Sequence, residues 1–211
     1  MKKLSIIIPV FNEENTIIKI LKTLEKVVLI NDIKKEFVIV DDCSSDSSTK
    51  IIEEYLIENN DIEIKFCKHS KNKGKGAALQ TGIKESTGDY VIVQDADLEY
   101  NPKDIPKLIK PIINLKYKAV YGSRVLGRNY FDNLKNFSHW IRILGNLFLT
   151  KFSNIINNQT LTDAHTCYKV FDKDLFVKIN LKENGFSFCP EITTKIGLKK
   201  ILIKEIPINY Y

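Results

Sequence analysis

The sequence has few cysteines, no cysteine pair spaced to bind a metal, and no apolar run long enough to cross a bilayer. Its four cysteines stand far apart, at Cys43, Cys67, Cys167 and Cys189. This spacing excludes a disulfide-stapled domain and a zinc ribbon, so we expect reduced thiols and a cytosolic protein. Nothing before Leu4 resembles a secretory signal, and a spanning helix needs about 20 apolar residues. We therefore expect that the chain does not cross a membrane by itself.

Arginine is also scarce, because Arg124, Arg128 and Arg142 are the only arginines among 32 basic residues. The formal net charge of +6 is carried mainly by lysine. A basic balance favours anionic partners such as nucleotides, phosphates, nucleic acid or an acidic membrane, without choosing among them. With 211 residues, 44% of them hydrophobic and 27% charged, the chain can build one sizeable core, which excludes a disordered or fibrous protein.

Strand-like and helix-like segments alternate through the first half of the chain. Apolar runs typical of buried strands occupy residues 4–10, 37–40, 62–67, 90–93 and 118–121. Helical spacing lies between them, for example at Ile17, Ile20, Leu21 and Leu24. This alternation with short links predicts an α/β protein with a doubly wound, mostly parallel sheet.

The pattern changes after Gly122. A polar stretch is followed by an aromatic-rich helical pattern at residues 137–152 and by shorter strand-like runs near residues 168–171 and 201–208. The chain shows no internal repeat and no low-complexity linker. We therefore predict a single domain over residues 1–211 with a C-terminal elaboration.

Charged side chains gather where the predicted strands end. Ligands of an open parallel sheet bind beyond the carboxyl ends of its strands. The residues at these ends are five carboxylates and one arginine: Glu13, Asp41, Asp42, Asp95, Asp97 and Arg124. Carboxylates at one edge repel one another, so we expect a positive ligand to bind there.

The run Asp95-Ala96-Asp97 is the sharpest local feature. Two aspartates two residues apart at a strand end point the same way and can share a hard cation. Mg²⁺ and Mn²⁺ usually take one or two carboxylates together with substrate phosphates, which suits a nucleoside diphosphate. The position of the motif at a strand end gives it weight, because short acidic motifs are common in turns.

Residues 72–76 (NKGKG) invite comparison with a phosphate loop. They do not match GxxxxGK[ST], and no GxGxxG follows the first strand, which excludes a nicotinamide oxidoreductase of the usual kind. Two interpretations stay open here. The stretch either caps a helix with a backbone nest or brings Lys75 to a phosphate group.

Several motifs together resemble a known family. They are PVFNEE (9–14), VDDCSSDSS (40–48), NKGKGAAL (72–79), QDADLEY (94–100) and GSR (122–124), followed by LTDAHTCYKVF (161–171) and GFSFCPEITTKI (185–196). The set resembles family 2 glycosyltransferases with the GT-A fold, most closely the dolichyl-phosphate mannose and glucose synthase branch. The resemblance implies a Rossmann-like, mostly parallel sheet flanked by helices. It also implies a nucleotide-sugar-binding half (1–122) and an acceptor-side half (123–211).

The resemblance assigns donor-binding roles in the first half. Pro9, Phe11 and Glu13 match positions that hold the base and ribose of a nucleoside diphosphate sugar. Asp41 or Asp42 matches the carboxylate that contacts the base.

The resemblance also assigns the reacting groups. Asp95, Ala96 and Asp97 match the motif that binds Mg²⁺ or Mn²⁺ with the diphosphate. Arg124 matches a basic residue that meets the diphosphate or the acceptor phosphate.

The implied reaction is an inverting transfer of a hexose from a UDP-glucose or GDP-mannose type donor to a polyprenyl or dolichyl phosphate. Asp163 and Glu191 are the candidates for a catalytic base. A phosphate acceptor is already ionised at neutral pH and needs positioning and charge neutralisation, whereas an alcohol acceptor needs a general base. The alternatives are a family 2 transferase acting on a saccharide hydroxyl, and a catalytically silent sugar-nucleotide-binding protein.

The helical pattern at residues 137–152 bears on the membrane. It predicts either a helix facing the core or an interfacial helix lying at the bilayer, where a lipid phosphate is presented. We expect peripheral membrane contact at the inner, cytoplasmic face. Nucleic acid is not an expected partner, because the predicted catalytic edge is acidic. His69 and His165 have no metal partners in sequence, and we expect surface or helix-capping histidines there and not ligands.

Overall fold

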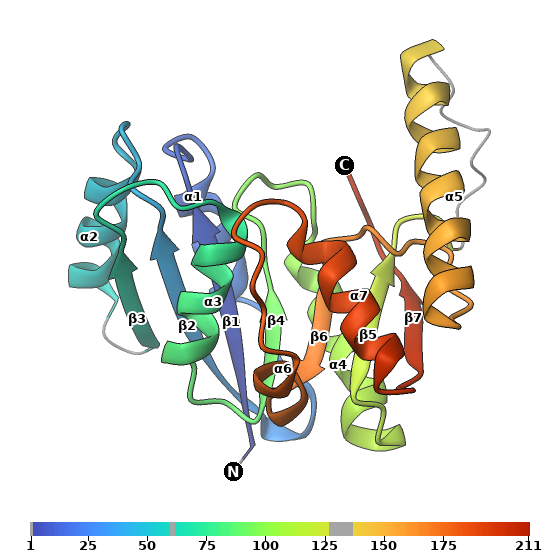
Figure 1. The fold of residues 1–211 in the computed structure, drawn as a ribbon. Coiled ribbons are helices and arrows are strands. Elements are labelled where there is room, and N and C mark those ends of the chain that lie inside the picture. Colours follow the sequence, from blue (N-terminus) through green and yellow to red (C-terminus); the bar gives the residue numbers. More distant parts are fainter. Residues whose placement is uncertain (1, 60–61, 127–136) are drawn as a thin grey trace.

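The computed structural model describes residues 2–59, 62–126 and 137–211. Within these residues one seven-stranded sheet has the order β3-β2-β1-β4-β6-β5-β7 (Figure 1). The strands are β1 (Lys3–Val10), β2 (Lys34–Asp41), β3 (Glu63–Lys68), β4 (Tyr90–Val93), β5 (Ala119–Ser123), β6 (Lys169–Asp172) and β7 (Ile203–Pro207). All neighbouring pairs are parallel except β4 with β6 and β5 with β6. The predicted mostly parallel α/β sheet is confirmed.

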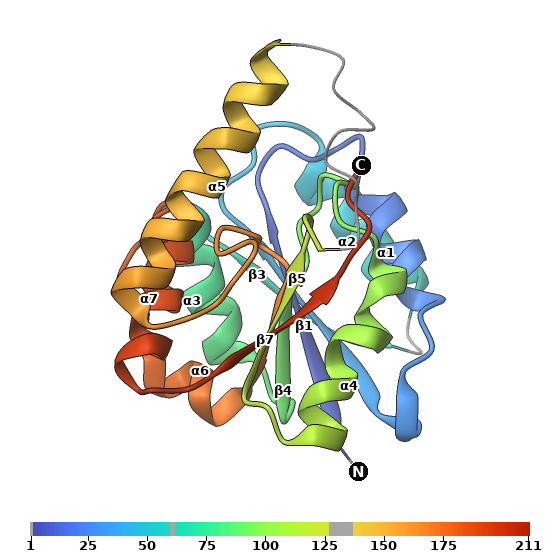
Figure 2. The same cartoon turned by 90° about the vertical axis from the view of Figure 1, so that its right-hand side faces the viewer.

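Helices cover both faces of the sheet (Figure 2). They are α1 (Ile17–Glu25), α2 (Ser48–Glu58), α3 (Lys75–Glu85), α4 (Ile105–Leu115), α5 (Phe137–Asn157), α6 (Lys173–Ile179) and α7 (Phe188–Leu198), with the 3₁₀ turns η1 (Ile30–Asp32) and η2 (Pro102–Asp104). Alternation along β1 sends Ile6 and Ile8 into the core cluster shared with α1 and α4, and Ile7 into the cluster shared with α3 and α7. Both faces are therefore buried, as continuous apolar strands require.

The second half of the chain completes the same sheet. The antiparallel strand β6 lies between β4 and β5, and β7 extends the sheet beyond β5. The sequence predicted short strands in these places, but their order in the sheet could not be read from local patterns. This order aligns the carboxyl ends of β1, β2 and β4 at the top of Figure 1.

Helix α5 projects past this carboxyl edge (Figure 1). Its side chains are described from residue 144 onward, and the predicted apolar residues Phe137, Trp140 and Ile141 lie outside that range. The apolar stripe of the described part does not face the core: Leu144, Phe148 and Phe152 are exposed, and Phe148 has 71% of its surface in contact with solvent. The core-facing interpretation is therefore wrong for this part. Among the described residues, no helix has the length and apolar character that crossing a bilayer requires.

A buried carboxylate links several segments at the opposite edge of the sheet, where the parallel strands have their amino ends. Glu36 in β2 accepts hydrogen bonds from the Ser5 hydroxyl, from the Thr87 backbone and hydroxyl, and from the Gly88 amide. Burial alone would raise the pKa of Glu36, but these donors outweigh it and lower the pKa to about 2.

We expect Glu36→Gln to lower the free energy of unfolding by about 3 kcal/mol at pH 7. Because folding lowers this pKa, ionised Glu36 stabilises the fold above the ordinary value of 4.5, and the contribution disappears as the pH falls toward 2. Denaturant titrations across this range should show the deficit shrinking. The exposed Glu63, which pairs with Lys3, is the control, with an expected change within about 0.5 kcal/mol for Glu63→Gln. Equal effects of the two substitutions would contradict this role.

Candidate active site

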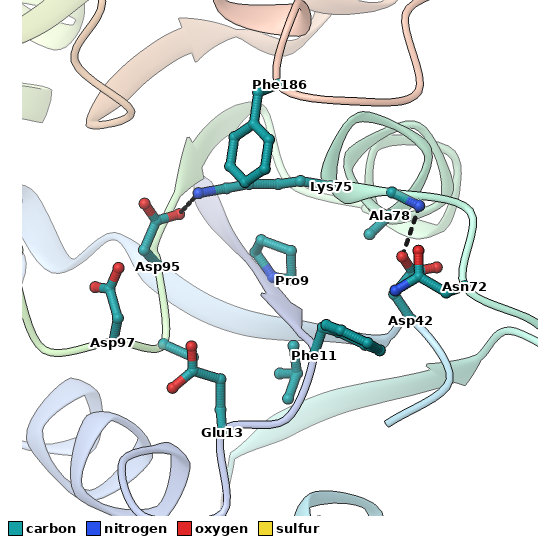
Figure 3. A pocket seen from close by; sticks show the side chains of 13 residues that line it. Pro9, Phe11, Glu13, Asp42, Asn72, Lys75, Ala78, Asp95, Asp97 and Phe186 are labelled. Atoms are coloured by element: carbon teal, nitrogen blue, oxygen red, sulfur yellow. Dashed lines mark hydrogen bonds and ion pairs between the residues drawn. The ribbon is translucent and has the colours of Figure 1, made fainter. Parts of the chain in front are cut away.

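A cavity of about 390 Å³ opens at the carboxyl edge of the sheet (Figure 3). Its volume lies within the range of pockets that bind small ligands. The lining residues come from the ends of β1, β2 and β4, from the start of α3 and from the loop before α7: Pro9, Val10, Phe11, Glu13, Asp42, Asn72, Gly74, Lys75, Ala78, Asp95, Ala96, Asp97 and Phe186. The site therefore lies where the strand-end rule predicts it.

The cavity brings together eight of the residues singled out in the sequence: Pro9, Phe11, Glu13, Asp42, Lys75, Asp95, Ala96 and Asp97. Four others are not among its lining residues: Asp41, Arg124, Asp163 and Glu191. Asp41 is fully buried. Its carboxylate accepts hydrogen bonds from the Ser44 amide and the Thr49 hydroxyl, so it shapes the turn after β2.

An ion pair crosses the cavity between α3 and the end of β4. The Lys75 Nζ lies 2.7 Å from Asp95 Oδ1 (Figure 3). Burial alone would lower the pKa of Lys75, but the charge of Asp95 raises it above its ordinary value. Asp95 Oδ1 is buried and accepts no well-directed hydrogen bond from any described residue. Asp95 therefore depends on a cation for its electrostatic balance.

Asp97 lies next to Asp95 and also lines the cavity (Figure 3). The surrounding protein displaces water from its carboxylate and raises its pKa, and the negative charge of Asp95 adds to the rise. One Asp97 oxygen accepts the Glu99 amide. The Asp95 carboxylate, whose Oδ1 faces the Lys75 ammonium, and the neighbouring Asp97 carboxylate form a hard oxygen donor set, which fits Mg²⁺ or Mn²⁺.

The start of α3 is held by protein groups. Asp42 accepts hydrogen bonds from the backbone amides of Lys73 and Gly74, and its Oδ1 lies 2.6 Å from the Nδ1 of His69. Gly74 adopts φ of 93°, which glycine tolerates best. These contacts favour the capping interpretation of the NKGKG stretch. The NKGKG stretch then contributes the Lys75 side chain to the cavity lining. His69 supports Asp42 through the contact between its Nδ1 and the carboxylate, which is a structural role.

A second close contact fastens the loop before α7 onto α3. The Ala77 amide donates to the carbonyl of Asn184 at 3.1 Å. Gly76 permits this approach, because a Cβ there would lie 2.1 Å from the Glu183 carbonyl oxygen. The same loop is also held by α7, because the Glu191 carboxylate accepts hydrogen bonds from the backbone amides of Lys182 and Glu183.

Glu191 therefore secures a loop and also pairs with Lys195, away from the cavity. This placement does not support the predicted role of Glu191 as a base. The loop that it holds presents Phe186, which sequence reasoning missed. Phe186 has 78% of its surface exposed and lines the cavity, and the centroid of its ring lies 5.9 Å from the Lys75 Nζ (Figure 3). An aromatic residue following Gly185 within the last quoted motif was its only signal in the sequence.

Arg124 and Asp163 form a bidentate pair at the end of β5. The Arg124 Nε and Nη2 donate to the two Asp163 oxygens at 2.7 and 2.8 Å, and the Arg124 amide adds a third hydrogen bond. Burial would raise the pKa of the fully enclosed Asp163, but Arg124 holds it below its ordinary value. Asp163 is thus a poor proton acceptor, and its observed contacts position Arg124.

Comparison with known proteins agrees with this geometry. The profile of the family "Glycosyl transferase family 2" matches residues 5–179. Over 208 to 223 aligned residues, 99% of the chain matches three archaeal proteins. A UDP-N-acetylglucosamine–dolichyl-phosphate N-acetylglucosaminyltransferase of Methanococcus voltae is 31% identical, and the match covers 85% of it. The hexosyltransferase Agl6 of Haloferax volcanii is 29% identical over 48% of its length, and a dolichol-phosphate mannosyltransferase of Pyrococcus furiosus is 28% identical over 56%. The chain thus spans about half the length of two of these relatives.

Solved structures confirm the GT-A fold. A mannosyltransferase from Pyrobaculum calidifontis, in complex with GDP-Man and Mn²⁺, superposes with a TM-score of 0.69 and 18% identity, covering 98% of this chain and 55% of that one. Glucosyl-3-phosphoglycerate synthase from Mycobacterium tuberculosis, in complex with Mg²⁺ and UDP, gives a TM-score of 0.71 and 16% identity, with coverages of 98% and 69%.

Substituting Gly76 tests the attachment of the loop to α3. We expect Gly76→Ala to lower the free energy of unfolding by about 2 kcal/mol or more, because the added methyl group meets a backbone carbonyl. Gly145→Ala is the matched control: it lies in α5 with nothing within 4 Å of the new Cβ, and alanine there should stabilise by up to about 1 kcal/mol. Chemical denaturation measures both. If Gly76→Ala is as stable as Gly145→Ala, the close approach is not a constraint.

Proposed function

The chain belongs to glycosyl transferase family 2, and from this premise we propose that it transfers a hexose to a polyprenyl or dolichyl phosphate. The donor is a nucleoside diphosphate sugar, and the anomeric configuration inverts. An acceptor phosphate oxygen forms the new bond to the anomeric carbon as the bond from that carbon to the donor diphosphate breaks. The nucleoside diphosphate leaves with both electrons of the broken bond, and no proton needs to move.

The cavity supports the donor assignment. Phe11 and Pro9 offer apolar surface for a base and ribose, and Lys75 offers a cation for the diphosphate. Asp97, with Asp95, would hold Mg²⁺ or Mn²⁺. When bound, this cation supplies charge neutralisation for the leaving diphosphate. Solved relatives of this fold bind GDP-Man with Mn²⁺ and UDP with Mg²⁺.

One observation carries the choice of a phosphate acceptor: both predicted bases are engaged elsewhere. Arg124 clasps Asp163 and depresses its pKa, and Glu191 lies outside the cavity on two backbone amides. A hydroxyl acceptor needs a base near its attacking oxygen, whereas a phosphate is already ionised. The dolichyl-phosphate acceptors in the names of two relatives support the same choice.

Helix α5 supports membrane contact on the acceptor side. Leu144, Phe148, Phe152 and Ile155 recur at three- and four-residue intervals and are exposed, so they form an apolar stripe. An apolar helical face with lysine nearby suits the interface of an acidic bilayer. A bilayer at this helix would bring a lipid-linked phosphate to the carboxyl edge.

Transfer to lipid is tested with a panel of radiolabelled UDP- and GDP-sugars and short polyprenyl phosphates. We expect one donor class to deliver label into the organic phase, and Asp97→Asn to reduce the rate about 10²-fold or more. Asp89→Asn is the matched control, because Asp89 pairs with Lys2 at the amino edge, and it should keep the wild-type rate.

Label confined to water-soluble saccharide would instead identify a transferase acting on a hydroxyl. Donor binding without transfer to any acceptor would identify a silent sugar-nucleotide-binding protein. Either result contradicts the proposal.

Membrane contact is tested by flotation with vesicles of phosphatidylcholine and phosphatidylglycerol. Replacing Phe148 and Phe152 together by aspartate should reduce the bound fraction about tenfold, because each change removes apolar burial and adds repulsion from the acidic lipid. Val28→Asp changes another exposed apolar residue, just after α1, and α1 covers the opposite face of the sheet from α5 (Figure 2); it should leave binding unchanged. Undiminished binding of the double variant would disprove a role for α5.

A further inference from the structure

The Lys75–Asp95 ion pair lies where a metal and a diphosphate are proposed to bind. The metal and the Lys75 ammonium therefore compete for Asp95. The pair is enclosed: the side chain of Lys75 is 16% exposed and that of Asp95 is 6% exposed. The ammonium also lies 3.7 Å from the Cys167 Sγ and faces the Phe186 ring. Among the described residues, Asp95 is the carboxylate with which it pairs.

We propose that Lys75 is an exchangeable counter-ion, which neutralises Asp95 when the site is empty and turns to the donor diphosphate when a divalent cation takes its place. This inference rests on the proposed donor site and deepens it. It assigns to Lys75 a control of metal binding that its family resemblance did not imply.

The exchange follows from electrostatics at close range. The ammonium, 2.7 Å from Asp95 Oδ1, occupies the place that a metal ion bound to this oxygen would take. A divalent ion there would repel the ammonium strongly. Moving the ammonium away from Asp95 costs energy when no other ligand is bound. Among the described residues, no second carboxylate pairs with Lys75, so its charge would stay enclosed without a counter-ion. A diphosphate in the cavity removes this cost by offering the ammonium a new anion.

The side chain is suited to such a change of partner. Lysine carries a compact charge on a flexible four-carbon stem, so its ammonium can move while the backbone stays in place. The backbone of α3 is fixed at this point by Asp42 and by the Asn184 carbonyl. Rotation of the Lys75 side chain is therefore enough, and the loop that presents Phe186 need not open.

The consequence is coupled binding. Metal alone must compete with Lys75, whereas metal together with a nucleoside diphosphate does not, so each ligand raises the affinity for the other by the same factor. A site built this way takes up the cation with its donor and retains little metal when empty.

The test measures Mn²⁺ binding by titration calorimetry and by the electron paramagnetic resonance signal of free Mn²⁺, without any turnover. Lys75→Met should bind Mn²⁺ alone about tenfold or more tightly than the wild type, because the competing charge is gone. In the same variant, UDP or GDP should raise Mn²⁺ affinity much less than in the wild type. Lys71→Met removes an equal charge from an exposed position nearby and should leave both affinities unchanged.

Removing one partner of a buried pair can unfold a protein, so Lys75→Gln, which keeps a polar side chain, serves as a second variant with the same expectation. Circular dichroism identifies the folded variant to be used. If Mn²⁺ alone binds it no more tightly than it binds the wild type, the exchange does not occur.

That comparison needs no nucleotide and decides the inference by itself. Failure of UDP and GDP to bind the wild type with Mn²⁺ would instead count against the proposed function. The two failures are therefore distinguishable.

Discussion

Negative charge concentrated at one edge of the sheet is the constraint on which the site depends. The register of β1, β2 and β4 brings their acidic ends together, and each carboxylate needs a partner. Asp42 is satisfied by backbone amides and His69, Asp95 by Lys75, and Asp163 by Arg124. These pairings place α3 against β2 and β4, and they hold the β5 end against the segment before β6.

Most of the strands and the place of the site could be predicted from the sequence, because both follow from local patterns. Continuous apolar runs marked β1 and β2, and the carboxylates that follow them marked the binding edge. The insertion of β6 between β4 and β5 could not be predicted, because sheet order depends on packing between distant segments.

The roles of single residues were harder to predict, for the same reason. Asp163 and Glu191 have the right chemistry for a base, but their roles depend on their partners. Asp163 pairs with Arg124, which is distant in the sequence, and Glu191 binds backbone amides of the loop before α7. Phe186 lacked a charged or polar signature and is placed over the cavity by contacts between α3 and the loop before α7. Helix α5 had the correct apolar spacing, and only its position relative to the sheet shows that the described part of its stripe is exposed.

If the proposed function holds, the cavity is the donor side of the molecule and α5 lies on its acceptor side. Strand ends and the anchored start of α3 shape the proposed donor cavity, where we propose that Lys75 changes partners. On the other side, Asp163 fixes the orientation of Arg124, and α5 offers an exposed apolar face. The cavity edge is acidic, so the net charge of +6 is not concentrated there.

The most direct test is a crystal structure of the chain with Mn²⁺ and a nucleoside diphosphate, with the metal located by anomalous diffraction. We expect an anomalous peak within ligand distance of Asp97 or Asp95, with the diphosphate in the cavity and the Lys75 ammonium moved from Asp95 to a phosphate oxygen. A metal bound elsewhere, or a nucleotide bound with the Lys75–Asp95 pair intact, would contradict it.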